Sequence, residues 1–131
     1  MKKLVSILFF ALFIFLSCNK DDETDLVSFQ KNFQIGDEYF SADNSLKFKV
    51  YAIQDSRCAS DVVCVWEGEA VVKIDVESPF TGTLELSTFD NQVDTLNNYS
   101  FELVDVSPYP ISTEVIDLED YDITLKIIQL N

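Results

Sequence analysis

The sequence predicts an all-β domain, a small antiparallel β-sandwich or barrel of about seven or eight strands. Apolar and polar residues alternate with a period of two in several short segments, as in strands that bury one face. No window shows the apolar stripe of a helix, although residues 112–118 are compatible with a short helical turn. This many short strands in about 105 residues is typical of one sandwich or barrel, and we find no repeat and no second domain.

The alternation marks the strands in order along the chain. Residues 29–33 and 37–40 show it weakly. Further strands are predicted at residues 46–52, 62–66, 69–77, 83–87, 99–106 and 123–130. Residues 78–82, Ser-Pro-Phe-Thr-Gly, have the composition of a hairpin loop between two of these strands. The residues predicted to point inward from the two clearest strands are Leu46, Phe48, Val50, Ala52, Ala70, Val72, Ile74 and Val76.

Residues 1–17 have the pattern of a signal peptide. Lys2 and Lys3 give a positive start, residues 4–16 carry no charge, and the small residue Ser17 precedes Cys18. The uncharged run is too short for a membrane span, which needs about 20 residues. We therefore expect residues 1–17 to be removed as a leader and residues 27–131 to form the single β domain.

The end of this leader, Phe-Leu-Ser-Cys at residues 15–18, resembles the lipobox of bacterial lipoproteins, although Phe15 replaces the usual aliphatic residue. The resemblance implies that Cys18 is acylated and that residues 18–26 are an acidic tether, so the membrane is the first partner. Residues 20–23, Lys-Asp-Asp-Glu, resemble the export signal of surface lipoproteins in Bacteroidota. They imply a lipid anchor on the outer face of the outer membrane, with the periplasmic face as the alternative.

The charge balance excludes one class of partner. The chain has 9 Lys and Arg against 23 Asp and Glu, and it has no His. Sequence-independent binding to nucleic acid depends on clustered Lys and Arg, so we expect no nucleic-acid partner. Without His the chain lacks the commonest general base and the commonest transition-metal ligand. We expect no cofactor.

Once Cys18 carries lipid, Cys58 and Cys64 remain in a compartment that permits disulfides. A bridge between them is the leading assignment, and it should contribute about 2–3 kcal/mol by closing a short loop. A zinc site is the poorer alternative, because no other Cys and no His completes the ligand set.

The segments around the two cysteines resemble an uncharacterised family of small bacterial proteins that are secreted or lipid-anchored. The shared pattern is Asp-Ser-Arg-Cys-x5-Cys-x-Trp-x-Gly at residues 55–68, followed by Pro-x-Pro at residues 108–110 and a closing alternating strand. Ala59 and Glu67 depart from the proline and alanine that are usual in that family. The resemblance implies a shared fold and supplies no catalytic residue.

The motif favours a packing role. Val62, Cys64 and Trp66 would share one face of a strand, so the disulfide and the indole are expected to pack together at one end of the core. Gly68 would let the chain turn into the next strand.

Arg57 is flanked by two acidic residues, Asp55 and Asp61. A carboxylate or backbone carbonyls holding the guanidinium would fix the loop. The alternative is that these three residues form a binding loop that presents Arg57 to a partner.

Three further features carry weaker hypotheses. Residues 117–122 are rich in carboxylates, which could bind calcium, but a solvated acidic loop is the favoured interpretation. Residues 94–96, Asp-Thr-Leu, resemble an O-glycan acceptor motif of Bacteroidota, with Thr95 as the attachment site. Ser56 and Ser60 lie near carboxylates but have no His or Lys nearby to activate a hydroxyl, so we predict no catalytic residue.

The predicted function is a non-enzymatic binding or accessory module of the cell envelope. Its partner would be an envelope or extracellular protein or a glycan of unknown identity. One alternative is an inhibitor of secreted proteases that uses the loop at residues 78–82 or 107–112. A weaker alternative is a hydrolase that uses two carboxylates.

Overall fold

The computed structural model describes residues 28–131, so the predicted leader at residues 1–17, Cys18 and the tether at residues 18–26 lie outside the described residues. The described elements, in chain order, are β1 (Ser28–Phe33), β2 (Glu38–Phe40), β3 (Lys47–Asp55), β4 (Ala70–Ser78), β5 (Gly82–Ser87), β6 (Val93–Leu96), β7 (Tyr99–Ser107), the 3-10 turn η1 (Leu118–Asp120) and β8 (Asp122–Gln129). None of the helical segments within these residues is long and apolar enough to cross a membrane.

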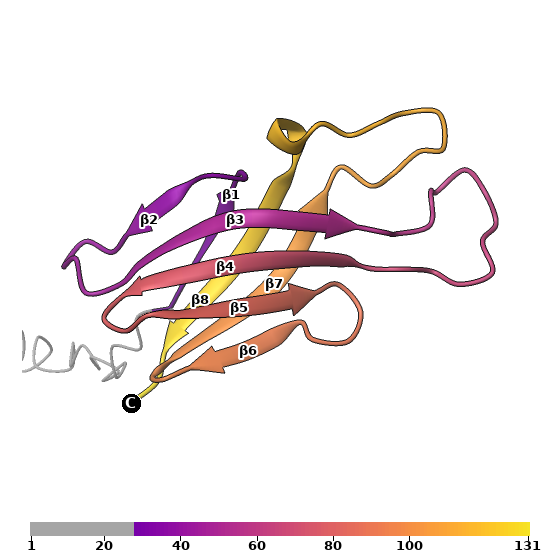
Figure 1. The fold of residues 1–131 in the computed structure, drawn as a ribbon. Coiled ribbons are helices and arrows are strands. Elements are labelled where there is room, and N and C mark those ends of the chain that lie inside the picture. The colour runs from indigo at the N-terminus through magenta and orange to yellow at the C-terminus, as the bar shows by residue number, and fades with distance from the viewer. Residues whose placement is uncertain (1–27) are drawn as a thin grey trace, which may run out of the picture.

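The eight strands form two antiparallel four-stranded sheets, as Figure 1 shows. One sheet has the strand order β1-β8-β7-β6 and the other has the order β2-β3-β4-β5. The chain crosses from the first sheet to the second between β1 and β2 and returns between β5 and β6. The sheets do not close into a barrel, so the predicted all-β fold is confirmed and its architecture is a sandwich.

The core lies between the two sheets. In β4 the predicted inward residues, from Ala70 to Val76 at every second position, are fully buried. Phe48 of β3 meets Phe101 of β7 across the sandwich, with ring centroids 5.5 Å apart in an edge-to-face arrangement. Burial of such rings and of the aliphatic side chains around them is the main source of stability in a domain of this size.

Register shifts reverse the alternation in two strands. Val50 of β3 points inward as predicted, but a shift in the pairing between Val50 and Ala52 leaves Ala52 only half-buried. A similar shift in β7 exposes Val104 and turns Val106 inward. A β-bulge inserts one residue into the ladder, so the inward positions change phase beyond it.

The structure corrects three other expectations. Residues 62–66 are not a strand but part of the long connection between β3 and β4, because the pairing of these two strands already ends at Asp55 and Ala70. The short edge strand β6 was not predicted. Residues 112–118 hold no helical turn, and η1 starts only at Leu118.

The two ends of the sandwich carry different connections between strands (Figure 1). At the end we call proximal lie the C-terminus and the turns at residues 41–46, 79–81 and 97–98. The start of β1 lies there too, because Ser28, the first described residue, pairs with Ile128 near the end of β8. At the opposite end, which we call distal, lie three longer connections at residues 56–69, 88–92 and 108–121. The two cysteine-containing segments at residues 55–68 and the Pro-x-Pro segment at residues 108–110 lie at the distal end.

Candidate functional site

Arg57 joins two of the distal connections to the sheets. Its Nε and Nη2 donate hydrogen bonds of 2.9 and 2.6 Å to the two carboxylate oxygens of Asp55. Nη1 donates to the carbonyl of Val106 at 2.7 Å, and Nη2 also donates to the carbonyl of Pro108 at 3.0 Å. The Arg57 and Asp55 side chains are each only 6% exposed. The guanidinium is therefore held by a carboxylate and by backbone carbonyls, as the first of the two sequence interpretations expects.

Two tyrosines complete this cluster. The hydroxyl of Tyr121 donates to Asp55 at 3.1 Å, and the Arg57 guanidinium lies 4.7 Å from the centroid of the Tyr109 ring. Burial alone would raise the pKa of the Asp55 carboxyl, but the hydrogen bonds and charge of Arg57, together with the Tyr121 hydroxyl, outweigh it and lower that pKa. Burial and the charge of Asp55 raise the pKa of Tyr121. Asp55 and Arg57 thus form a buried ion pair.

The alternative in which the loop presents Arg57 to a partner conflicts with this geometry, because the guanidinium points inward.

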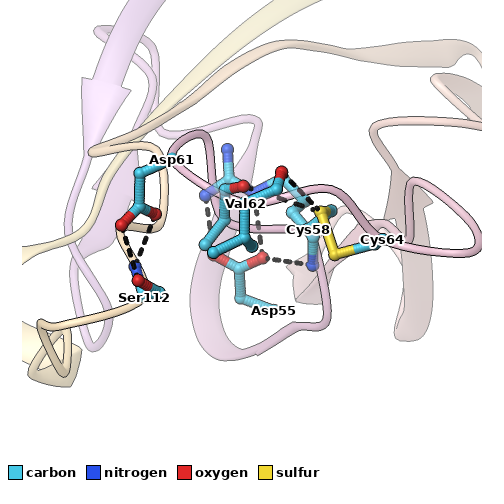
Figure 2. Close-up of a disulfide and its surroundings, with 8 residues drawn as sticks. Asp55, Cys58, Asp61, Val62, Cys64 and Ser112 are labelled. Atoms are coloured by element: carbon cyan, nitrogen blue, oxygen red, sulfur yellow. Dashed lines mark hydrogen bonds and ion pairs between the residues drawn. A yellow bond between two sulfur atoms is a disulfide. The ribbon is translucent and has the colours of Figure 1, made fainter.

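Asp61 does not take part in the Arg57–Asp55 ion pair. Its carboxylate accepts hydrogen bonds from the backbone N–H and the hydroxyl of Ser112, at 2.8 and 2.5 Å, and Figure 2 shows it pointing toward Ser112. These bonds lower the pKa of Asp61. A third link, from the Ser60 N–H to the Pro110 carbonyl at 2.9 Å, fastens residues 56–69 to residues 108–121.

The disulfide between Cys58 and Cys64 is present, with the two Cα atoms 5.9 Å apart (Figure 2). The expected packing of Trp66 against it at the end of the core is wrong. Trp66 is 73% exposed, and Val63 and Val65 are fully exposed. The Arg57–Asp55–Tyr121 cluster occupies this end of the sandwich, so the bridge and the indole lie on an outer loop.

Gly68 has the turning role that the sequence predicts. Its φ of +67° lies in the left-handed region, and a Cβ atom there would stand 1.9 Å from the carbonyl oxygen of Ser56. The close approach brings the two arms of the loop together, and the Cys58 N–H donates to the Glu67 carbonyl at 2.7 Å. A glycine is required at this position.

Large apolar side chains are concentrated on the distal loops. Of the fourteen that are exposed within residues 28–131, nine lie on the three distal connections, which make up about a third of those residues. We call these nine the distal patch: Val62, Val63, Val65, Trp66, Phe89, Tyr109, Ile111, Val115 and Leu118. Exposed apolar side chains that are concentrated on one part of a protein surface often mark a site of contact with another molecule.

Two adjoining hollows lie between residues 56–69 and residues 88–92. The first, of about 220 Å³, is lined mainly by apolar surface and has Trp66 and Phe89 among its walls, with the carboxylate-bearing residues Glu67, Glu69 and Asp90. The second, of about 290 Å³, shares Glu67, Gly68 and Phe89 with it and extends to Arg57, Asp105 and Tyr109. The Ser87 hydroxyl donates to the Glu69 carboxylate, so Glu69 is fixed in place.

The remaining predicted residues lie apart from these hollows. Thr95 is exposed on the edge strand β6, and its N–H bonds to the carboxylate of Asp94 at 2.8 Å. Residues 117–122 cover η1 and the start of β8. Throughout residues 28–131 no three Asp, Glu or Cys side chains are grouped so that they could hold a metal ion.

Sequence reasoning missed Tyr109, Tyr121 and Phe89. The first belongs to the Pro-x-Pro segment that the sequence had singled out, so a partner for Arg57 could have been sought there. Phe89 and Tyr121 follow no pattern that distinguishes them from other aromatic residues. Their roles come from chain segments that meet only in the folded molecule.

The site combines exposed aromatic and aliphatic side chains with carboxylate-bearing residues around two hollows. The Ser56 hydroxyl donates to the backbone carbonyl of Glu69, at 2.9 Å. No known protein family, no curated protein and no solved structure matches this chain.

Proposed function

We propose that this chain is a lipid-anchored protein of the cell envelope, exposed at the cell surface, and that its sandwich is a non-enzymatic binding module that contacts its partner through the distal patch. The observation that carries the proposal is the concentration of exposed apolar side chains on three loops at one end of the molecule. Loops on a rigid sheet scaffold are common binding surfaces, and Trp and Tyr are enriched in the residues that dominate binding energy.

The position of the patch supports this proposal. The described chain begins with Ser28 at the proximal end, ten residues after the proposed acylation site Cys18. A lipid on Cys18 would join the domain to the membrane through that end. The distal patch would then face away from the membrane, where an envelope or extracellular partner can reach it.

Site-specific photo-crosslinking in cells that express the protein tests the proposal. A photoreactive phenylalanine analogue is placed at Val65, which is fully exposed in the patch. The matched control carries it at Thr83, exposed on β5. We expect discrete crosslinked adducts from position 65 and none from position 83. The same adducts from both positions, or none from either, would contradict the assignment of the patch as the binding surface.

The inhibitor alternative needs a loop that is free to enter a protease cleft. Residues 79–81 form a short turn at the proximal end, and Phe80 within it packs against the core. Residues 107–112 are fastened by Arg57 and Asp61. A panel of secreted proteases assayed with the purified chain tests this alternative directly, and slowing of any of them would favour it over the module proposed above.

A further inference from the structure

We propose that the partner of the distal patch is a cationic protein segment, and that one Lys or Arg side chain of that segment sits in the hollow between Trp66 and Phe89. This inference rests on the proposed function and adds to it the chemistry of the occupant. Three observations lead to it: the absence of free positive charge at the distal end, the lining of the hollow, and a similar arrangement that the molecule already uses for Arg57.

Positive charge is absent from the distal loops except for one residue that is already paired. The chain has no Lys, Arg or His at residues 58–72 or 74–125. Arg57 is neutralised by Asp55, at 2.6 Å. The other ion pairs within residues 28–131 join Lys47, Lys73 and Lys126 to Glu77, Glu85 and Glu102, all on strands.

The carboxylates of the hollow form no ion pair with any Lys or Arg of the described residues. Neither Glu67 nor Asp90 takes part in an ion pair within the described part of the chain. Both line the Trp66–Phe89 hollow. A surface of this sign attracts a cationic partner and repels an anionic one, including an anionic membrane.

The lining of the hollow matches the side chains of Lys and Arg, which carry a charged head on an apolar stem. The surface of the hollow is mainly apolar, and its two aromatic lining residues are Trp66 and Phe89. Three residues with carboxylates also line it: Glu67, Glu69 and Asp90. The stem would lie against the two rings, where a cation also gains from the face of the indole, and the head would reach a carboxylate. A neutral glycan could stack on the same rings and donate hydroxyl hydrogen bonds to the carboxylates, but it carries no positive charge to complement them.

The molecule itself contains a cation in comparable surroundings. Arg57 and Tyr109 line the adjoining hollow, and the guanidinium lies 4.7 Å from the centre of the Tyr109 ring. The guanidinium also bonds to the buried carboxylate of Asp55. Aromatic ring and carboxylate thus hold an arginine side chain there. The Trp66–Phe89 hollow offers the same two kinds of group with no internal cation.

The single tryptophan of the chain, Trp66, makes the test direct, because its fluorescence reports on this hollow. The full-length chain is titrated with three synthetic peptides of equal length, which alternate Lys with Leu, Lys with Gly, and Glu with Leu. We expect the Lys–Leu peptide to bind most tightly and to shift Trp66 emission to shorter wavelength. The Lys–Gly peptide should bind weakly and the Glu–Leu peptide not at all.

A pair of charge-matched double variants separates this site from the general acidity of the protein. Glu67→Gln with Asp90→Asn should weaken binding of the Lys–Leu peptide by about tenfold. Glu38→Gln with Asp75→Asn removes the same amount of charge from β2 and β4, and it should change the affinity for the Lys–Leu peptide by less than about twofold. Equal weakening by both double variants would overturn the proposed site.

Two further outcomes would overturn the cationic occupant. One is binding of the Glu–Leu peptide as tightly as the Lys–Leu peptide. The other is binding of a neutral glycan, from an array, that survives the Glu67→Gln and Asp90→Asn changes. If crosslinks from position 65 persist while the Lys–Leu peptide fails to bind, the binding module stands and only its occupant is wrong. If both fail, the binding module itself is wrong.

Discussion

Arg57 is the residue at which the segments of the distal end converge. It bonds to Asp55 at the end of β3, to the Val106 carbonyl of β7 and to the Pro108 carbonyl beyond it. The planar fork of guanidinium donors can satisfy all of these acceptors at once, whereas an ammonium group cannot. The cluster therefore orders the base of two of the three loops that carry the distal patch, at residues 56–69 and 108–121.

Removal of this side chain should be costly. We expect Arg57→Ala to lower the free energy of unfolding by about 3 kcal/mol, because it leaves the buried Asp55 carboxylate without its cation. Arg57→Lys should recover only part of the loss, since it restores the charge without the fork. The control is Lys73→Ala, which breaks a partly exposed pair with Glu85 and should cost less than about 1 kcal/mol. Urea denaturation measures all three, and equal costs for Arg57→Ala and Lys73→Ala would refute the buried pair.

Three carboxyl groups should make the fold sensitive to acid. Hydrogen bonds from Ser41 and Ser45 lower the pKa of Asp43 to about 2, and the pKa values of Asp55 and Asp61 are also lowered. A carboxyl whose pKa is lower in the folded state stabilises that state above its unfolded pKa, about 3.9, and the stabilisation disappears as the pH falls through the folded pKa. We therefore expect these groups to contribute fully near neutral pH and progressively less below about pH 4.

Variants of these carboxyl groups test whether they cause the loss of stability in acid. Asp43→Asn and Asp61→Asn should each be less stable than the unmodified chain near neutral pH, and the difference should shrink below about pH 4. Denaturant unfolding at a series of pH values measures the difference. A constant difference across that range would show that neither carboxyl has a lowered pKa.

At the scale of elements, the loop at residues 56–69 depends on Gly68. A Cβ atom there would meet the Ser56 carbonyl oxygen at 1.9 Å, in addition to the strain of a positive φ. Gly36 also has a positive φ, of +96°, but a Cβ on it would meet nothing within 4 Å. We expect Gly68→Ala to lower the free energy of unfolding by at least about 1 kcal/mol more than Gly36→Ala does, because only the former adds a backbone clash. Similar costs in chemical denaturation would mean that the loop can rearrange around the methyl group.

The disulfide should stabilise the same loop without deciding the fold. Cys58 and Cys64 lie outside the core, and their bridge closes a short loop. Replacing both by Ser should lower the free energy of unfolding by about 2 kcal/mol, while far-UV circular dichroism stays that of a β protein. Crosslinking from position 65 should weaken, because the loop loses its constraint. Loss of cooperative unfolding would instead give the bridge a role in holding the two sheets together.

The elements differ in how far the sequence predicts them. The strands β1, β2, β4, β5, β7 and β8 lie within one residue of their predicted bounds, whereas β3 continues three residues beyond its predicted end at Ala52. The longer strands are predicted well because their alternating apolar residues face the opposite sheet. The alternation of Val62, Cys64 and Trp66 is similar in form but belongs to an exposed loop that pairs with no strand of either sheet. Local pattern cannot reveal whether a partner strand is available.

The sequence likewise predicts some contacts of the candidate site and not others. The pairing of Arg57 with Asp55 joins residues two apart, so the sequence could predict it. The other acceptors of Arg57, the carbonyls of Val106 and Pro108, lie 49 and 51 residues further along the chain. Tyr121 reaches Asp55 across 66 residues. The hollow between Trp66 and Phe89 likewise depends on two loops that meet only after the sheets have packed.

At the scale of the whole molecule, charge and apolar surface are unevenly distributed. The lysines described lie on strands, where three of them pair with glutamates, whereas the distal loops hold exposed apolar side chains and unpaired carboxylates. The proximal end holds Ser28, through which a lipid on Cys18 would join the domain to the membrane. The proposed surface-anchored module, with its contact surface at the end far from the anchor, would account for this uneven distribution.

The anchor is the last element of this arrangement to test. We expect the unmodified chain to sediment with membranes and Cys18→Ala to be released, because each CH2 of an acyl chain that enters the membrane contributes about 0.8 kcal/mol and no acyl chain attaches to alanine. Cys58→Ser with Cys64→Ser is the matched control, which removes the other two cysteines and their bridge but should stay with the membrane. Protease added to intact cells should cut the unmodified chain if the domain faces outward. Cosedimentation of Cys18→Ala with membranes would exclude the lipid anchor, and resistance to protease in intact cells that is lost after outer-membrane lysis would place the domain on the periplasmic face.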